Sequence, residues 1–192
     1  MRNFFFKLRI LINFIKYKLV FRESKKFLID FNCNIVGGDL ISIGQNFAAK
    51  KGLRIEAFGS DNLLKIEIGN FVSLGENVHI GAINKINIGN NVLVGSRIII
   101  IDHNHGKYNG NNQSSPLEIP SRRQLHSNGP INIGDNVWIG DGVVVLSNVT
   151  IGKGAIIAAN TVVNKNVENF TLVGGNPMRL IKKFNFTNNT WE

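Results

Sequence analysis

From residue 66 onward, aliphatic residues of the kind that face a protein interior recur in runs with a spacing of six positions. A glycine follows many of them, and a small or β-branched residue usually stands four positions later. A period of six fits neither an α-helix nor a long amphipathic strand, which repeat every 3.6 and 2.0 residues. The aliphatic positions are Ile68, Leu74, Ile80, Ile88, Val94 and Ile100, then after an interruption Ile133, Ile139, Val145, Ile151, Ile157 and Val163, with a weaker early set at Ile43, Ala49 and Ile55.

The six-residue period predicts a parallel β-helix of hexapeptide repeats, an all-β fold in which a short strand ends at a corner after each repeat. The aliphatic side chain points into the prism and stacks on its equivalent one coil away. The glycine beside it is expected to tolerate a corner backbone that would strain a residue with a Cβ. Three repeats close one coil, so we expect about five coils, each stabilised by its neighbours.

The chain of 192 residues suits one domain with appendages. Residues 1–30 form a basic and aromatic N-terminal segment, residues 31–183 the predicted β-helix domain, and residues 184–192 a short tail that we expect to be frayed. The repeat has one long interruption, at residues 102–130, which are polar and rich in Gly, Asn, Ser and Pro. A loop of this length inside a compact domain is usually functional.

The net charge of +9 is concentrated at the N-terminus, where residues 1–26 contain eight Lys and Arg residues and one Glu. The rest of the chain is nearly neutral, so nucleic-acid binding is not expected. Apolar residues in this segment have helical spacing, but basic residues interrupt them before a run reaches the roughly 20 residues of a membrane-spanning helix. Two interpretations stay open: a helix packed on its own protein or a neighbouring subunit, and an interfacial helix on an anionic membrane.

One cysteine, Cys33, excludes an internal disulfide and fits a reduced, cytoplasmic setting. No small-residue cleavage site follows the N-terminal segment, so a secretory signal is not expected either. The localisation expected from the sequence is therefore cytoplasmic, with peripheral contact at the inner membrane face as an extension of it.

The stretch INIGDNVWIGDGVVVLSNVTIGKGAIIAANTVVNKNV, followed by VGGNPMRLIKK, resembles the hexapeptide-repeat acyltransferases with a left-handed parallel β-helix. Within that family it is most similar to the galactoside, maltose and surface-polysaccharide O-acetyltransferases. The resemblance covers roughly residues 40–183. It implies a left-handed coil, acetyl-CoA as the donor, a carbohydrate acceptor, and a homotrimer with three active sites between adjacent prisms.

The stretch IDHNHG opens the long loop with two histidines. Acetyl transfer to a sugar hydroxyl needs a base that removes the proton as the oxygen attacks the thioester carbonyl, and a neutral imidazole suits this step. In the resembled family a histidine at the start of this loop is the base, which falls on His103. His105 is then a helper, a substrate contact, a loop residue or the base itself. Asp102 or a backbone carbonyl is expected to bind the ring nitrogen of His103 that does not act as the base.

A purely structural role for both histidines and a metal site are the alternatives at this stretch. His103 and His105 together with His126 would supply three nitrogen ligands. No convincing cluster of carboxylates and histidines completes such a site in the sequence, so no metal is expected.

The resemblance also implies a donor site. Trp138 is expected beside the pantetheine arm, where an indole narrows the tunnel near the thioester, with plain packing as the alternative. Gly140 and Gly142 would leave room for the thin pantetheine. Basic residues at the last coil would bind the donor's phosphates or form an ordinary solvated face. The rest of the predicted donor site is Ala158, Ala159, Thr161, Lys165, Asn176, Pro177, Arg179, Lys182 and Lys183.

The expected activity is an acetyl-CoA-dependent O-acetyltransferase acting on a bacterial surface glycan, such as an O-antigen or capsule unit, or on its precursor. Transfer is expected to be direct, because no nucleophile for a covalent intermediate is evident. An N-acetyltransferase acting on an amino-sugar nucleotide and a non-catalytic or metal-binding β-helix protein are the alternatives. Loop candidates for binding the acceptor, which face solvent in the other interpretation, are Lys107, Tyr108, Arg122, Arg123 and His126.

Overall fold

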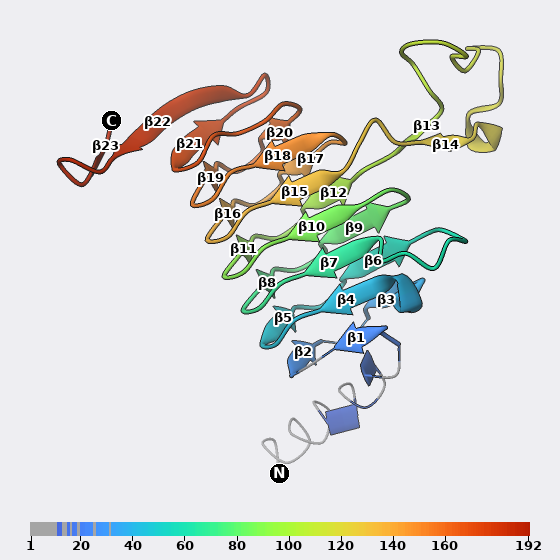
Figure 1. Ribbon diagram of the computed structural model, residues 1–192, viewed down its shortest axis with the longest axis horizontal. Helices are drawn as coiled ribbons and strands as arrows, with labels where there is room; N and C mark the ends of the chain where they lie inside the picture. The colour runs from blue at the N-terminus through green and yellow to red at the C-terminus, as the bar shows by residue number, and fades with distance from the viewer. Residues whose placement is uncertain (1–10, 13–14, 16, 19, 25, 31) are drawn as a thin grey trace.

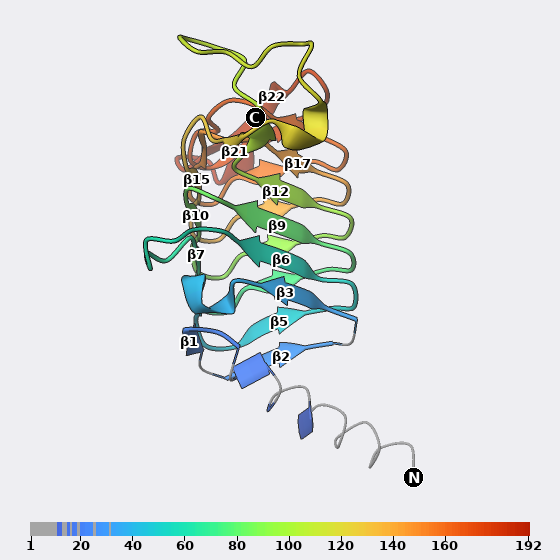
Figure 2. The same ribbon diagram turned by 90° about the vertical axis from the view of Figure 1, so that its right-hand side faces the viewer.

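The protein is an elongated, three-sided prism of stacked coils, with a hairpin projecting from one corner (Figures 1 and 2). The first coil lies at one end of the prism and the C-terminal hairpin at the other. The computed structural model describes residues 11, 12, 15, 17, 18, 20–24, 26–30 and 32–192.

Three sheets form the sides of the prism, and each coil gives one strand to each sheet. Sheet A contains β1 (Glu23–Ser24), β4 (Ile41–Ile43), β7 (Ile66–Ile68), β10 (Ile86–Ile88), β15 (Ile131–Ile133) and β18 (Val149–Ile151). Sheet B contains β2 (Phe27–Ile29), β5 (Phe47–Ala49), β8 (Ser73–Leu74), β11 (Leu93–Val94), β16 (Trp138–Ile139), β19 (Ile156–Ile157) and β21 (Thr171–Gly174), followed by β22 (Arg179–Asn185) and β23 (Thr190–Trp191). Sheet C contains β3 (Asn34–Val36), β6 (Arg54–Ala57), β9 (His79–Ala82), β12 (Ile99–Ile101), β17 (Val144–Val145) and β20 (Val162–Val163).

The described residues form six coils rather than about five, because sheets A and C each hold six strands. The additional coil consists of β1, β2 and β3, so the prism begins near Glu23, inside the range that the sequence assigned to the N-terminal segment. The strands of this coil do not follow the regular six-residue spacing, so the sequence pattern did not predict it.

The strand register confirms that the six-residue period is the repeat of the prism. Ile68 pairs with Ile88, and Ile88 pairs with Ile133, so each aliphatic stacks on its equivalent one coil away. The fifteen predicted interior positions are all at most 5% exposed. Their burial is the main source of stability, at about 1.5–3 kcal/mol for each fully buried large aliphatic.

The corners depend on glycine for a different reason from the one expected. The residue in the left-handed region stands three positions after the aliphatic and is often Asn, as at Asn77 and Asn91, with φ of 55° and 56°. Asn tolerates that conformation better than most residues do. The glycine directly after the aliphatic is needed because the coils stack closely. A Cβ on Gly75 would lie 2.5 Å from the carbonyl oxygen of Gly95.

Aromatic residues close the N-terminal end of the prism. Tyr17, Phe21 and Phe27 are buried, and Phe21 meets Phe27 edge to face at 5.9 Å between ring centroids. Residues 11, 12, 15, 17 and 18 are helical, while most of the expected N-terminal helix lies outside the described residues. No helix in the described part of the chain is long and apolar enough to cross a membrane.

The C-terminal tail is an ordered hairpin, which corrects the expectation of a frayed end. Strand β22 runs antiparallel to both β21 and β23. Phe184 meets Phe186 and Trp191 edge to face at 4.9 and 5.3 Å, and Phe186 meets Phe170 at 4.9 Å. These contacts between aromatic rings hold residues 184–192 in place.

Candidate active site

The long loop leaves the prism after β12, at the corner between sheets C and A (Figure 1). Within it, β13 (Asn104–His105) and β14 (Leu125–His126) form an antiparallel pair, with a 3₁₀ turn at η2 (Pro120–Arg122). A second 3₁₀ turn, η1 (Gly38–Leu40), precedes β4 in an earlier coil. The two residues between β12 and β13 are Asp102 and His103, so both lie at the edge of the prism.

Asp102 is fully buried at this edge. Its carboxylate accepts backbone N–H bonds from Ile83 at 3.0 Å, Asn84 at 2.9 Å and Lys85 at 2.8 Å. These donors belong to the corresponding corner of the preceding coil. A buried carboxylate needs such partners, because burying it unpaired would be costly. The preceding coil therefore fixes the position of Asp102 without any help from the loop.

Asp102 in turn orients His103. The Oδ1 atom of Asp102 lies 3.0 Å from Nδ1 of His103, whose side chain is 13% exposed. Because an ionised carboxylate only accepts hydrogen bonds, Nδ1 carries the proton of the neutral ring and Nε2 is left as an acceptor. This is the arrangement of a general base held in its working tautomer by a carboxylate. Of the two orienting groups considered from the sequence, the structure has the carboxylate.

The rest of the loop is held by hydrogen bonds between its own residues. Arg123 donates to the hydroxyl of Tyr108 at 2.9 Å and to the carbonyl of Glu118 at 3.0 Å, and Tyr108 donates to the carbonyl of His105. Arg123 and Tyr108, predicted to bind the acceptor, thus act first as supports of the hairpin. His105 is exposed on β13. Lys107 and His126 are half-buried on the same excursion, and Arg122 is exposed.

The predicted donor site is centred on sheet B. Leu93 and Trp138 are adjacent in the register and about half exposed, at 52% and 51%. The same row continues through Ile156 and Leu172 to Lys182 on β22. Three strand spacings of about 4.8 Å separate Trp138 from Lys182, or about 14 Å. An apolar strip that ends at a basic residue fits a donor with a thin chain and a phosphate-rich end.

Other predicted donor residues have different roles. Thr161 is fully buried, donates to the carbonyl of Ala158 at 2.6 Å and accepts from the N–H of Gly175 at 3.1 Å, so it holds two turns together and cannot touch a donor on the surface. Gly140 makes room for the next coil, because its Cβ would lie 2.7 Å from the nitrogen of Ala159.

The remaining donor candidates divide between two places. Gly142 has a φ of 71° at the corner between sheets B and C, so glycine there serves the backbone. Lys165 follows β20, at the corner between sheets C and A, and is separated from the donor strip by the width of sheet C. Arg179 and Lys183 lie on β22, while Asn176 and Pro177 lie in the turn before it.

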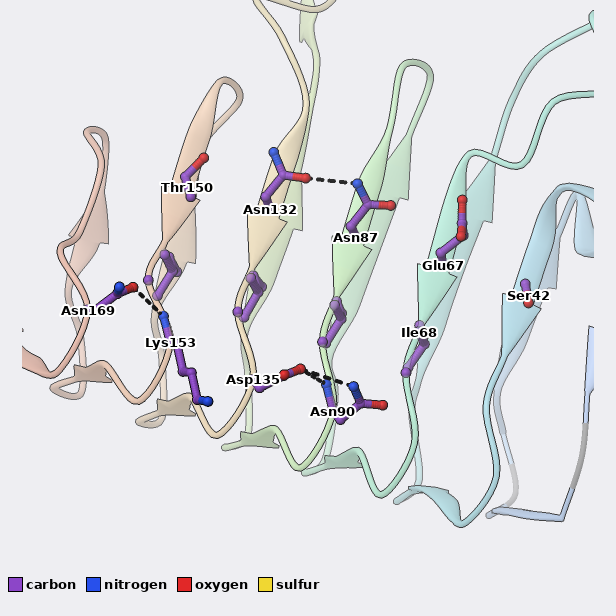
Figure 3. Close-up of a pocket in the computed structure, with 17 residues that line it drawn as sticks. Ser42, Glu67, Ile68, Asn87, Asn90, Asn132, Asp135, Thr150, Lys153 and Asn169 are labelled. Carbon is purple, nitrogen blue, oxygen red and sulfur yellow. Dashed lines mark hydrogen bonds between the residues drawn. The ribbon is translucent and has the colours of Figure 1, made fainter.

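The outer face of sheet A is lined by polar side chains in successive coils, including Ser42, Glu67, Asn87, Asn132 and Thr150. A groove of about 710 Å³ runs along its outer surface (Figure 3). Asn87 donates to Asn132 at 2.8 Å, and the backbone N–H of Asn90 donates to Asp135 at 2.6 Å. These ladders pair side chains and backbone of successive coils. His103 does not line the groove, so the groove is not the catalytic centre.

The chain is similar in sequence to several known proteins. Residues 130–165 match the family model described as bacterial transferase hexapeptide (six repeats). WbbJ of Escherichia coli K12, named as a candidate lipopolysaccharide biosynthesis O-acetyl transferase, is 33% identical over 186 residues, covering 96% of this chain and 92% of its own. This chain is a hexapeptide-repeat acetyltransferase.

A further sequence relative agrees with that assignment, and a solved structure has the same fold. Galactoside O-acetyltransferase of Escherichia coli K12 is 31% identical over 132 residues, covering 60% of this chain and 58% of its own. The N-acyltransferase AntD of Bacillus cereus, solved as a variant with dTDP-4-amino-4,6-dideoxyglucose and coenzyme A, matches with a TM-score of 0.75 at 21% identity, covering 92% of this chain and 91% of its own. The expected left-handed parallel β-helix is confirmed.

The acetyltransferase contains polar residues beside His103 that the sequence analysis missed. His79 and Glu56 lie on the outer face of sheet C and are 3.0 Å apart between Nε2 and Oε2. The sequence could have indicated this pair, because aligning the hexads of Ile55 and Ile80 places Glu56 and His79 in adjacent coils. In the described part of the chain, no group of three His, Cys, Asp or Glu side chains is arranged to hold a metal ion.

Proposed function

We propose that this acetyltransferase transfers an acetyl group from acetyl-CoA to a sugar hydroxyl of a bacterial surface glycan or its precursor, with His103 as the general base. The observation that carries the proposal is the Asp102–His103 pair, which leaves Nε2 as the free acceptor at the edge of the prism. The relatives named as O-acetyltransferases support the choice of a hydroxyl acceptor.

His103 would act twice in each turnover. Its Nε2 removes the proton from the acceptor hydroxyl as that oxygen bonds to the thioester carbonyl carbon. When the carbon–sulfur bond breaks, the same nitrogen returns the proton to the leaving thiolate. The buried carboxylate of Asp102 stabilises the imidazolium that exists between the two steps.

We infer that the working enzyme is a homotrimer with its active sites between prisms. The predicted donor strip lies on sheet B, whereas His103 lies at the corner between sheets C and A. A second copy would bring a donor strip to this corner. The outer faces of sheets B and C carry exposed aliphatic residues, including Leu93, Ile99 and Leu146, whereas the outer face of sheet A is polar. Apolar surface of this kind marks an interface.

In this assembly Trp138 would lie against the pantetheine arm, and the basic residues of β22 would meet the phosphates. Arg179 and Lys182 are both exposed on that strand. Lys182 Nζ also donates to the carbonyl of Trp191 at 3.1 Å, which ties its position to the C-terminal hairpin.

We also propose that the enzyme works in the cytoplasm with its N-terminus at the inner membrane face. Leu11, Ile12 and Ile15 are more than half exposed, and residues 1–26 are strongly basic. Apolar side chains beside Lys and Arg suit an anionic lipid surface. Cosedimentation with phosphatidylglycerol vesicles, compared with phosphatidylcholine vesicles, would test this, and equal recovery on both would contradict it.

The activity is tested by measuring thiol release from acetyl-CoA with two panels of acceptors. One contains neutral and acidic glycan oligosaccharides, and the other contains amino-sugar nucleotides. We expect turnover with hydroxyl acceptors, lost in His103→Ala and retained in His105→Ala. Turnover only with amines would assign the enzyme to N-acetylation, and loss of activity only in His105→Ala would move the base to that residue.

A further inference from the structure

The groove on the outer face of sheet A has two polar edges (Figure 3). Each sheet A strand from β4 to β18 has one outward side chain, and these side chains form one edge. The other edge follows the corner between sheets A and B, and the floor between the edges includes Gly69, Gly89, Gly134 and Gly152. These five strands make four strand spacings of about 4.8 Å, so the groove extends over about 19 Å. This length exceeds that of a single sugar ring and suits a chain of several.

Some polar groups in the groove bond to nothing else in the protein. The hydroxyls of Ser42 and Thr150 and the ammonium of Lys153 have no hydrogen-bond or ion-pair partner among the described residues. Asn90 and Asp135, by contrast, bond to each other and belong to the scaffold. A hydroxyl both donates and accepts, and an ammonium has three donors. The free groups can therefore bind a ligand without breaking any contact of the fold.

Phe71 stands at the corner that bounds the groove, two residues after Gly69. Its φ of 57° lies in the left-handed region, which is unfavourable for a bulky residue. The side chain is 51% exposed, and no other aromatic ring in the described part of the chain contacts it. A strained residue of this kind points to a function at its position. The equivalent residues after the other four strands have the same conformation and are Asn46, Asn91, Asn136 and Gly154.

Lys85 connects the groove to the catalytic corner. Its backbone N–H donates to Asp102 at 2.8 Å, and its ammonium binds the carboxylate of Glu67, which lines the groove. The long loop leaves the prism after the coil of β10 and returns at β15, so His103 stands beside the middle of the groove. A chain that lies along sheet A therefore passes the corner at which the base stands.

We propose that this groove, with Phe71 at its edge, binds the sugar chain of an oligosaccharide acceptor while one unit of that chain reaches His103. Sugar hydroxyls bond to the free groups of Ser42, Thr150 and Lys153, and the apolar C–H face of a ring packs on Phe71. The proposed trimer uses the faces of sheets B and C, which leaves sheet A open to the chain. This inference rests on the proposed O-acetyltransferase activity and specifies an assembled oligosaccharide as its acceptor.

Phe71→Asn separates binding from folding. Asn is the residue that neighbouring coils have in this conformation, so the variant should melt at or above the wild-type temperature. Thr150→Val keeps the shape of the side chain in β18 and removes only the hydroxyl. The matched control is Thr187→Val, which removes an exposed hydroxyl from the turn between β22 and β23, outside the groove.

The acceptors are fragments of the surface polysaccharide of the bacterium that makes this protein, freed of ester groups by mild alkali, partially hydrolysed and separated by size. Saturation-transfer NMR measures their binding. For wild type we expect kcat/KM to rise at least about tenfold from a single sugar to a fragment of about four sugars. In Phe71→Asn and Thr150→Val we expect the KM of the long fragments to rise at least about fivefold, the effect of about one hydrogen bond, and that of the single sugar to change less. Thr187→Val should behave as wild type.

Equal kcat/KM for short and long fragments, or long-fragment KM values at the wild-type level in both groove variants, would overturn the groove inference and leave the O-acetyltransferase activity standing. Long fragments that wild type neither binds nor acetylates would overturn it as well. If wild type acetylates amino-sugar nucleotides and none of the fragments, the proposed function fails, and its oligosaccharide acceptor fails with it.

Discussion

Asp102 both binds the backbone of the preceding coil and orients His103. Replacing it with Asn separates these two tasks, because the amide has one acceptor oxygen where the carboxylate has two. Oδ1 of Asp102 meets the N–H of Ile83 and Nδ1 of His103, while Oδ2 meets the N–H groups of Asn84 and Lys85. An amide nitrogen on the Oδ2 side would face two donors. On the Oδ1 side it faces one backbone donor and can donate to His103. We therefore expect the amide nitrogen on the Oδ1 side.

In that orientation the variant holds His103 in the wrong tautomer. Nδ1 becomes the acceptor of the amide, so the ring proton moves to Nε2, and Nε2 can no longer remove a proton from the acceptor. A wrong tautomer in a carboxylate-oriented histidine costs about 10⁴-fold in kcat. One backbone N–H, that of Ile83, is left buried without a partner, at a cost of about 1–3 kcal/mol. For a chain of this size this lowers Tm by about 2–12 °C.

The assay compares kcat, acetyl-CoA affinity and thermal melting of Asp102→Asn with those of Asp135→Asn. Asp135 also accepts a backbone N–H across coils, from Asn90, but on the far corner of sheet A. In Asp135→Asn the amide oxygen can keep both bonds from Asn90 at the Oδ1 position, so we expect only Asp102→Asn to melt earlier and to lose kcat, with acetyl-CoA binding retained in both variants. A kcat of Asp102→Asn within about tenfold of wild type would refute the assignment of Asp102 as the group that orients the base.

Three further outcomes follow from the same geometry. Burial acts to raise the pKa of Glu56, but hydrogen bonds from Arg54 and His79 outweigh it and lower the pKa below its ordinary value of 4.5, so Glu56→Gln should be less stable than wild type above pH 4.5. This difference in stability should shrink as the pH falls below 4.5. Urea unfolding at about pH 7 and about pH 3.5 checks this, and an equal difference at both pH values would contradict it. Gly95→Ala should cost about 1–3 kcal/mol, since its Cβ would lie 2.3 Å from the next coil, and an unchanged melting temperature would count against the close stacking of the corners. Trp138→Ala should raise the acetyl-CoA KM about tenfold with little change in Tm because the indole is half exposed, whereas a large fall in Tm with an unchanged KM would mean that the indole is packing alone.

The fold could be predicted because it depends on local spacing. Each hexad places one aliphatic side chain inside the prism, and successive coils repeat the same contact, as Ile68, Ile88 and Ile133 do. Such an architecture is nearly one-dimensional, so a period read along the chain is enough to specify it. The same spacing marked residues 102–130 as the place where the repeat is interrupted.

The site required the tertiary structure, because its parts come from different coils whose corners vary in length. Arg54 pairs with His79, which in turn pairs with Ile99, so successive partners stand 25 and then 20 positions apart. The backbone donors that hold Asp102 come from the turn of the preceding coil, 17 to 19 positions earlier.

By itself, then, the sequence determined the prism, its long loop and the histidine that opens the loop. Only the tertiary structure decided that Asp102 is buried against another coil, that Thr161 is enclosed, and that His79 stands across Gly81 from His103. The physical reason is that interior positions follow from a local period, whereas hydrogen bonds between coils depend on how corners of unequal length bring distant residues into register.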